Sequence, residues 1–355
     1  MPIVAHNQLP AFNRLQQEGI KILQPGVALH QDIRELHIGL LNMMPDAAIS
    51  ATERQFFRLI GESNPIAQFF VHPFTLDSLP RSEKAKQHID TYYETFEEIR
   101  AQGLDGLIVT GANVEGNELS NQDFWEPLIE VFNWAHENVC STLCSCLATH
   151  AVMEFRYKQQ RFPNKNKIWG VYPHKILESH PLVRGVNTRF DVPHSRWNSI
   201  SEDQFKSANL RILAKSNADE IHLATSEDGL RTVFFQGHPE YDNISLLKEY
   251  KREVMLFIQG KREDYPPFPD NYFNQFEQAI FREYRYLTEK ALEANEQAPD
   301  FPEHIIIRRL NNTWHDTADE IVSNWMGLIY QVTHKDRNKM FMDHIDPENP
   351  LGLKN

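Results

Sequence analysis

The residues of this chain whose types and spacing favour chemistry are a cysteine at a turn and a histidine two positions before a glutamate. Cys146 stands between a short β-type run at residues 139–145 and a helical pattern at 147–155. A nucleophile at a sharp strand-to-helix turn projects from the sheet beside the positive end of the helix dipole. This position favours the thiolate, and the Leu147 N–H becomes a candidate oxyanion donor. The alternative is an inert cysteine at the end of a core strand.

The second motif is the segment Gln236-Gly-His-Pro-Glu240, which follows the apolar run 232–235. His238 and Glu240 point to the same side of an extended segment because they are two residues apart. A carboxylate beside an imidazole fixes the tautomer of the ring and stabilises its charged form. Alone, the motif also fits a solvated ion pair in a surface loop. Together with Cys146 it predicts a Cys-His-Glu set for nucleophilic catalysis.

The chain has three cysteines, and their clustering also permits a metal site. Cys140, Cys144 and Cys146, with His136 or His150, offer sulfur and nitrogen ligands of the kind that zinc prefers. The spacing lacks the paired Cys-x-x-Cys arrangement of structural zinc sites, so we expect no metal.

Composition excludes several classes of function. The 355 residues contain 36 Lys+Arg and 49 Asp+Glu, and the net charge of −13 argues against nucleic acid or an anionic membrane surface as a partner. No apolar run approaches the roughly 20 residues of a membrane helix, and the N-terminus does not resemble a secretory signal. An odd cysteine count does not suggest disulfides. We expect a soluble, cytoplasmic, globular protein.

The alternation of apolar runs with helical patterns predicts an α/β protein with a mostly parallel sheet. We expect strands at 36–43, 66–74, 106–110, 139–145, 211–214, 220–224 and 232–236. We expect helices from Ser50, where Ser50 and Glu53 have capping-box spacing, and in 82–102, 124–137, 147–155, 243–258, 273–294 and 317–332. Residues 111–116 form a predicted turn, and 160–200 are predicted to be rich in loops.

A proline-rich segment at 264–270 is the predicted boundary between two parts of the chain, because prolines 266, 267 and 269 cannot continue a helix. The sequence therefore predicts an α/β domain at 1–263. A helical C-terminal segment, 264–355, is expected to pack on that domain or at a subunit interface.

Several stretches resemble, in order, the homoserine O-acyltransferase family of methionine biosynthesis, the succinyl- and acetyltransferases. The matching stretches are Leu41-Asn-Met-Met-Pro45, Ala51-Thr-Glu-Arg-Gln-Phe-Phe-Arg-Leu59, Asp105-Gly-Leu-Ile-Val-Thr-Gly-Ala112, Ser141-Thr-Leu143 leading to Cys146, Gly170-Val-Tyr172, Pro193-His-Ser-Arg196, Gly237-His-Pro-Glu-Tyr-Asp242, Asn324-Trp325 and Tyr330-Gln-Val-Thr333. The resemblance covers about residues 1 to 340. It implies a flavodoxin-like, class I glutamine-amidotransferase-like fold, with helices on both faces of the sheet and a helical C-terminal extension.

The resemblance also implies roles for single residues. Cys146 would be the acyl-thioester nucleophile, His238 the proton acceptor and Glu240 the residue that orients the histidine. Lys167, Ser195 and Arg252 would touch substrate, although each also fits a solvated loop, turn or helix position. The implied mechanism is ping-pong: Cys146 takes the acyl group from an acyl-CoA, and the hydroxyl of L-homoserine then attacks the acyl-enzyme. Arg252 would hold the homoserine carboxylate.

The identity of the acyl donor depends on two conflicting signals. Glu115 matches the family position at which glutamate accompanies acetyl and glycine accompanies succinyl, and a fixed carboxylate would repel a succinyl carboxylate. The residues that make up the motifs instead resemble those of a subgroup of succinyltransferases. We therefore expect succinyl-CoA as the acyl donor, with acetyl-CoA as the alternative.

Three further alternatives stay open. The acceptor could be serine, which is one methylene shorter than homoserine. The chain could be a glutamine amidotransferase, although no glycine flanks Cys146, or a non-catalytic ligand sensor. The resemblance implies a homodimer and no metal or bound cofactor.

Overall fold

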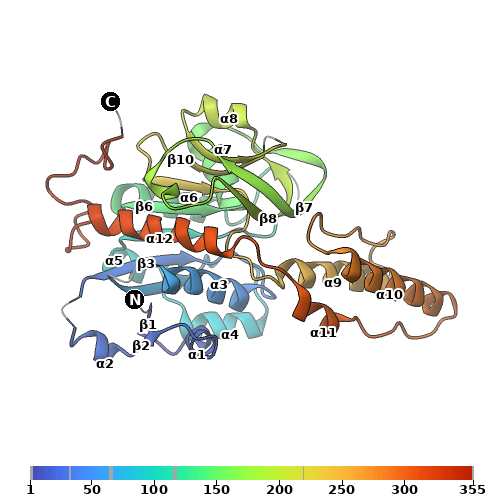
Figure 1. Cartoon of the computed structure of the whole chain (residues 1–355). Coiled ribbons are helices and arrows are strands. Elements are labelled where there is room, and N and C mark those ends of the chain that lie inside the picture. The colour runs from blue at the N-terminus through green and yellow to red at the C-terminus, as the bar shows by residue number, and fades with distance from the viewer. Residues whose placement is uncertain (1–2, 32, 64–66, 115–117, 219, 354–355) are drawn as a thin grey trace.

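One mixed β-sheet positions the functional residues. The computed structural model describes residues 3–31, 33–63, 67–114, 118–218 and 220–353. The strands are β1 (Ile3–Val4), β2 (Ile22–Leu23), β3 (Glu35–Leu41), β4 (Gln68–Phe74), β5 (Gly106–Val109), β6 (Ser141–Ser145), β7 (Phe162–Ile176), β8 (Arg189–Ser199), β9 (Arg211–Ser216), β10 (Ile221–Thr225) and β11 (Thr232–Phe235). Their order is β2-β1-β4-β3-β5-β6-β11-β10-β9-β7-β8 (Figure 1). The strands from β2 to β11 in this order are parallel, and the pairs from β11 to β8 are antiparallel.

Helices cover both faces of the sheet. They are α1 (Pro10–Gln17), α2 (Pro25–Ala28), α3 (Ile49–Glu62), α4 (Glu83–Tyr92), α5 (Phe96–Gln102), α6 (Trp125–Asn138), α7 (Leu147–Tyr157), α8 (Glu202–Ser207), α9 (Ser245–Ile258), α10 (Gln275–Glu293), α11 (Glu303–Ile306) and α12 (His315–Val332), with 3-10 turns η1 (Pro181–Val183) and η2 (Ile307–Arg309). The strand residues alternate between two cores: Ile108 and Phe235 pack with α1, α3 and α12, whereas Leu107 and Phe234 pack with α5, α6 and α7. This alternation is the two-residue period of a strand buried on both faces.

The helices α9, α10 and α11 project from the sheet as an arm, on the right in Figure 1. The arm has its own aromatic core, in which Tyr250, Phe273 and Phe281 pack together and Trp169 of β7 joins them. The chain then returns, and α12 packs against the sheet, with Trp325 fully buried. Residues after the proline-rich segment therefore belong both to the arm and to the core of the main body.

The predicted strands and helices are confirmed apart from four features. Ser50 does not cap α3, because the helix begins one residue earlier; Ser50 is exposed and Glu53 is buried against Tyr93 and His88. The helical stretch 82–102 is two helices, α4 and α5, separated by residues 93–95. The predicted turn at 111–116 and the first residue of the predicted strand 66–74 fall partly outside the described residues.

The fourth difference is the largest. Residues 160–200, predicted to be rich in loops, form the long antiparallel pair β7 and β8 at one edge of the sheet. Polar residues and prolines at 163, 173 and 193 obscured this pair, yet an edge tolerates both. In the described part of the chain, no helix combines the length and apolarity needed to cross a membrane.

Candidate active site

Cys146 lies at a sharp turn between β6 and α7, as predicted. Its φ of 53° and ψ of −107° are unusual for a residue with a side chain, and such conformations cost about 1–3 kcal/mol. The Cys146 N–H donates to the Phe235 carbonyl at 2.7 Å, and Thr149 Oγ1 lies 2.8 Å from the Cys144 carbonyl and 2.9 Å from that of Phe235. These bonds hold the strained turn against the end of the neighbouring strand β11.

The same pair of strands brings the histidine to the cysteine. Because β6 and β11 are parallel neighbours, with Ser145 opposite Phe235, the residues that follow each strand meet at one edge of the sheet. His238 makes a hydrogen bond with Cys146, and its Nδ1 lies 2.8 Å from Oε1 of Glu240. The ring of Tyr241 stacks on the imidazole at 4.4 Å. The three residues predicted as a Cys-His-Glu set are therefore in contact.

The electrostatics of this set favour charge separation. Burial alone would raise the pKa of the Cys146 thiol, but the neighbouring His238 lowers it below its usual value. Burial alone would likewise lower the pKa of His238, but Cys146 and Glu240 raise it well above the usual range. A thiolate beside an imidazolium is the reactive form of a nucleophilic cysteine. The arrangement can attack a carbonyl carbon and then move a proton.

The space beside the nucleophile is bordered by two backbone segments. Leu147 is the first residue of α7, so its N–H has no partner within the helix. Gly111 follows β5 on the other side: a Cβ on Gly111 would lie 3.8 Å from the Leu147 nitrogen and 3.8 Å from the Cys146 Cβ. A small anionic oxygen can occupy this gap.

A half-buried carboxylate on the arm, which sequence reasoning missed, lies close to the set. Oε2 of Glu249, on α9, accepts from Ser195 Oγ at 2.6 Å and lies 3.2 Å from Nζ of Lys167. Its Oε1 accepts from the Tyr241 hydroxyl at 2.8 Å. Burial would raise the pKa of the Glu249 carboxyl, but Lys167 and these hydroxyl groups lower it. The sequence offered one indication of Glu249: it lies next to buried residues of α9, three positions before Arg252.

The other predicted substrate residues are placed differently. Lys167 and Ser195 meet at Glu249, and the Lys167 ammonium also lies 4.5 Å from the Trp169 ring centre. Arg252 is exposed, and it pairs with its neighbour Glu253 at the surface of α9. The structure therefore does not bring Arg252 into the Lys167–Ser195 cluster. Glu115 lies outside the described residues.

A buried cation, Arg196, lies near the catalytic set. Arg196 of β8 pairs with Glu220 and contacts His194, whose Nε2 lies 3.3 Å from Nε2 of His174. The His194 ring would lie 2.9 Å from a Cβ on Gly237, so only glycine fits next to His238. Arg196 adds to the positive charge that favours the Cys146 thiolate.

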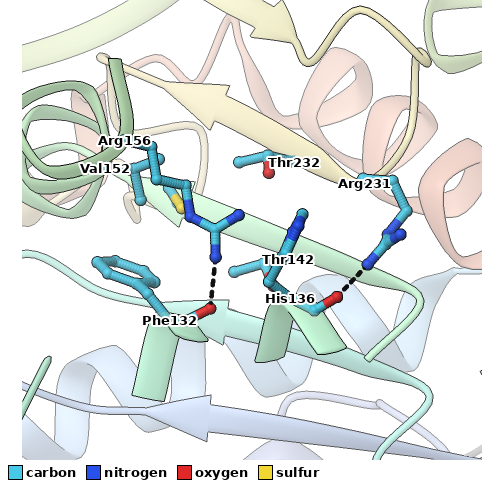
Figure 2. A pocket seen from close by; sticks show the side chains of 8 residues that line it. Phe132, His136, Thr142, Val152, Arg156, Arg231 and Thr232 are labelled. Carbon is cyan, nitrogen blue, oxygen red and sulfur yellow. Dashed lines mark hydrogen bonds between the residues drawn. The ribbon is translucent and has the colours of Figure 1, made fainter. Parts of the chain in front are cut away.

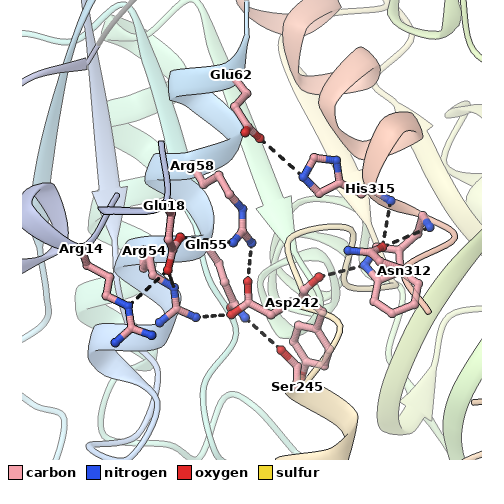
Figure 3. A network of polar contacts seen from close by, with 12 residues as sticks. Arg14, Glu18, Arg54, Gln55, Arg58, Glu62, Asp242, Ser245, Asn312 and His315 are labelled. Atoms are coloured by element: carbon pink, nitrogen blue, oxygen red, sulfur yellow. Dashed lines mark hydrogen bonds and ion pairs between the residues drawn. The ribbon is translucent and has the colours of Figure 1, made fainter. Parts of the chain in front are cut away.

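Ion pairs anchor the segment after Glu240 to α3 (Figure 3). Asp242 pairs with both Arg54 and Arg58, and Gln55 donates to Ser245 Oγ at 3.0 Å. Glu18 lies 3.7–3.8 Å from the same two guanidinium groups. This network holds the loop that carries the predicted base.

Replacing Asp242 with asparagine should destabilise the fold by about 2 kcal/mol at pH 7, because two guanidinium groups would lose a buried partner. Burial would raise the pKa of Asp242, but Arg58 and Arg54 lower it below its usual 3.8. A carboxyl group whose pKa is lower in the folded state than in the unfolded state stabilises the fold at pH values above its unfolded-state pKa. This stabilisation is lost as the pH falls through the folded-state pKa. Urea unfolding from pH 8 to pH 3 should therefore show a gap between wild type and Asp242→Asn that closes below about pH 4. Asp264→Asn, an exposed carboxylate paired with Arg262, is the control and should show almost no gap. A gap that stays constant to pH 3 would contradict this account.

The zinc alternative is wrong. Cys140 packs in the core on one face of the sheet and Cys144 in the core on the other, so they cannot share an ion. Burial raises the pKa of both thiols far above the usual range. Among the described residues, the groups with ligand atoms within 4.8 Å of one another are His6–His72–Glu94 and Glu62–His315–Asp319, and neither contains a cysteine.

Comparison with known proteins decides the family. A family model described as homoserine O-succinyltransferase matches residues 2–335. A homoserine O-succinyltransferase of Allochromatium vinosum is 63% identical over 354 residues, covering 99% of both chains. One from Nitrosococcus oceani is 61% identical and covers 100% of this chain and 99% of its own.

The chain belongs to the homoserine O-succinyltransferase family. This confirms the predicted family and reaction class, acyl transfer in methionine biosynthesis, and it favours the succinyl donor over the acetyl donor that Glu115 suggested. A relative from Thiobacillus denitrificans with the same name is 58% identical and covers 99% of this chain.

Solved structures are more distant. A glutamine amido transferase from Methylobacillus flagellatus is 12% identical, with a TM-score of 0.49, and covers 88% of this chain and 98% of its own. A glutamine amidotransferase from Thermotoga maritima is also 12% identical, with a TM-score of 0.45, and covers 84% of this chain and 99% of its own.

Proposed function

We propose that this family member transfers the succinyl group of succinyl-CoA to the hydroxyl of L-homoserine through a thioester on Cys146. The observation that carries the proposal is the Cys146–His238–Glu240 set at the strained turn, where the nucleophile and its base are in contact. The thiolate attacks the thioester carbonyl, and CoA leaves as a thiol with the proton held by His238. His238 then takes the proton of the homoserine hydroxyl as its oxygen attacks the acyl-enzyme, and the Cys146 sulfur leaves. Glu240 fixes the tautomer and stabilises the charged ring.

The oxyanion of each tetrahedral intermediate occupies the gap between Gly111 and Leu147. The Leu147 N–H points from the first turn of α7, where backbone donors and the helix dipole favour an anion. The backbone after β5 supplies the opposite wall of the gap. Donors of this kind act in catalysis because they are already in place when the charge develops.

Gly111→Ala tests this assignment. The added methyl group would stand 3.8 Å from its nearest neighbours, an ordinary contact, so the fold should be retained. The same methyl would fill the space assigned to the oxyanion, so kcat for acyl transfer should fall by about 100-fold or more. Steady-state kinetics with a thermal unfolding control measures both effects. Full activity in a folded variant would remove Gly111 from the oxyanion site.

The acceptor site is the cluster around Glu249. An amino acid carries an ammonium and a carboxylate, and this cluster offers a carboxylate and the Lys167 ammonium side by side. We assign Glu249 to bind the substrate ammonium, and Lys167 and Ser195 to bind other polar groups of the substrate. The exposed Arg252, on the same helix as Glu249, would bind the substrate carboxylate. Serine carries the same two charges, so homoserine preference depends on how far the hydroxyl reaches toward His238.

The proposal also covers the acyl donor, the cellular location, the oligomeric state and the domain bounds. Relatives named as succinyltransferases support succinyl-CoA, and Glu115 is proposed to influence donor choice, which a Glu115→Gly donor ratio would test. We propose a cytoplasmic enzyme that works as a homodimer, with exposed apolar residues such as Phe276 and Leu287 on the arm available for contact. We propose that residues 1–263 form the catalytic domain and that 264–355 pack on it.

Initial-rate kinetics tests the reaction itself. If succinyl-CoA donates to Cys146 before homoserine binds, double-reciprocal plots at several homoserine concentrations should be parallel. Homoserine should give a higher kcat/KM than serine, and succinyl-CoA a higher one than acetyl-CoA. Intersecting plots would indicate direct transfer without an acyl-enzyme.

A further inference from the structure

A narrow pocket lies between α6, α7 and the strands β6 and β11 (Figure 2). Thr142, near the start of β6, and Thr232, the first residue of β11, contribute to its wall. Its volume is about 10 Å³, the space of about one water molecule. The catalytic set follows the other ends of the same two strands, so the pocket is separate from the proposed active site.

Two guanidinium groups and an imidazole line this pocket. Nη2 of Arg156 donates to the Phe132 carbonyl at 2.8 Å, and Arg231 donates to the His136 carbonyl, both on α6. Figure 2 shows the two arginines reaching the pocket from opposite sides, with Thr142 and His136 between them. A guanidinium has five N–H donors, so each arginine keeps donors available after its carbonyl bond.

The two positive charges lack a carboxylate partner in the described part of the chain. Burial lowers the pKa of Arg156, and the charge of Arg231 lowers it further. Burial also lowers the pKa of His136, and both arginines add to this effect, which Glu348 and Glu137 oppose. The described contacts include no ion pair between these two glutamates and either arginine. Like charges that share a partly buried site repel one another unless an anion joins them.

A third carboxylate near the pocket is already used by the backbone. Oδ1 of Asp228 accepts from the N–H groups of Leu230 at 2.8 Å and Arg231 at 2.6 Å. Asp228 therefore shapes the turn before β11 and is not paired with the Arg231 side chain. The aromatic ring of Phe341, 5.4 Å from the Arg231 guanidinium carbon, covers that group on one side.

We propose that this pocket is a binding site for a compact oxyanion, a phosphate or carboxylate group, clamped between Arg156 and Arg231. The planar guanidinium fork matches the oxygen geometry of both groups. Thr142 and Thr232 bring hydroxyl groups to the wall for further hydrogen bonds. The small volume admits an oxygen or two of the anion, and the rest of the group faces the open mouth. The proposal is independent of the acyl-transfer mechanism, because none of these residues has a part in it.

Thermal unfolding in inorganic phosphate tests the site, with chloride at equal ionic strength as the reference. A ligand that binds only the folded state raises Tm, and a phosphate concentration several-fold above Kd should raise it by about 1–3 °C, with a further rise that follows the logarithm of the concentration. Acetate replaces phosphate in a second arm, and the anion that raises Tm at the lower concentration identifies the chemistry that the site prefers.

Arg156→Gln and Arg231→Gln should each abolish the response. Arg285→Gln, on the arm and paired with Glu289, removes the same charge elsewhere and should keep the response. Either pocket variant suffices if the other does not fold, and calorimetric titration of the wild type with phosphate should give one site per chain. Equal shifts in chloride, or a phosphate response that survives in the folded pocket variants, would overturn the proposal.

Discussion

Replacing His238 with alanine should lower acyl transfer by about 100- to 10,000-fold, the usual contribution of a positioned acid–base group. The same change should raise the pKa of Cys146. In the wild type, burial opposes the thiolate and His238 outweighs it, so removing the imidazole leaves burial as the largest influence. At pH 7 the thiol of the variant would therefore be almost fully protonated.

The pH profile of iodoacetamide alkylation measures this effect directly. The wild type should react at a lower pH than an ordinary thiol, whereas His238→Ala should react only at higher pH. The signal belongs to Cys146, because Cys140 and Cys144 are buried with raised pKa values. Glu240→Gln keeps the ring but removes a carboxylate that raises the pKa values of both His238 and Cys146, so its alkylation profile should stay closer to the wild type than that of His238→Ala. An unchanged alkylation profile in a folded His238→Ala variant would show that the contact does not activate the thiol.

Glu249→Gln should raise KM for homoserine by about 100-fold, the loss of a charged hydrogen bond to the substrate ammonium. Glutamine has the same shape: its oxygen can accept from one of the hydroxyl groups of Ser195 and Tyr241, and its NH2 group can donate to the other, so the cluster should keep its structure. The first half-reaction uses only succinyl-CoA, so formation of the acyl-enzyme should be almost unchanged. If Glu249 had only a structural role, the substitution would instead impair both half-reactions.

The matched control for this change lies elsewhere on the arm. Glu289 of α10 pairs with Arg285, and neither residue has a part in the proposed acceptor site. Glu289→Gln removes the same charge outside the cluster and should leave KM for homoserine within about two-fold. A similar rise in both variants would point to the overall charge of the arm, and an unchanged KM in Glu249→Gln would remove Glu249 from the acceptor site.

The catalytic set was predictable because its parts are local in sequence. The turn at Cys146 and the two-residue spacing of His238 and Glu240 are features of single segments, and parallel pairing of their strands brings the segments together. The alternating strands and the longer helices were predictable for the same reason. The proposed substrate-binding residues were not predictable in this way, because Lys167 and Ser195 were indicated only by family resemblance.

Features that depend on tertiary packing were not predictable. Glu249 is one of several charged residues on α9, and only the folding of the arm onto β7 and β8 buries it beside Lys167. The pair β7 and β8 escaped prediction because β8 is the edge strand and β7 pairs with β9 only near its end, and strands in such positions tolerate polar residues and prolines. Ser50 and Glu53 had the spacing of a capping box, but α3 begins at Ile49, and Glu53 is buried and accepts from the Tyr93 hydroxyl.

Intact-protein mass spectrometry after brief incubation with succinyl-CoA, without acceptor, tests the central claim most directly. We predict one succinyl adduct per chain that is sensitive to hydroxylamine, absent in Cys146→Ala, and lost when homoserine is added. Acetyl-CoA should give a smaller adduct fraction. An adduct that persists in Cys146→Ala, or no adduct from either CoA ester in active protein, would contradict a thioester on Cys146. A non-catalytic ligand sensor would give no adduct and no turnover.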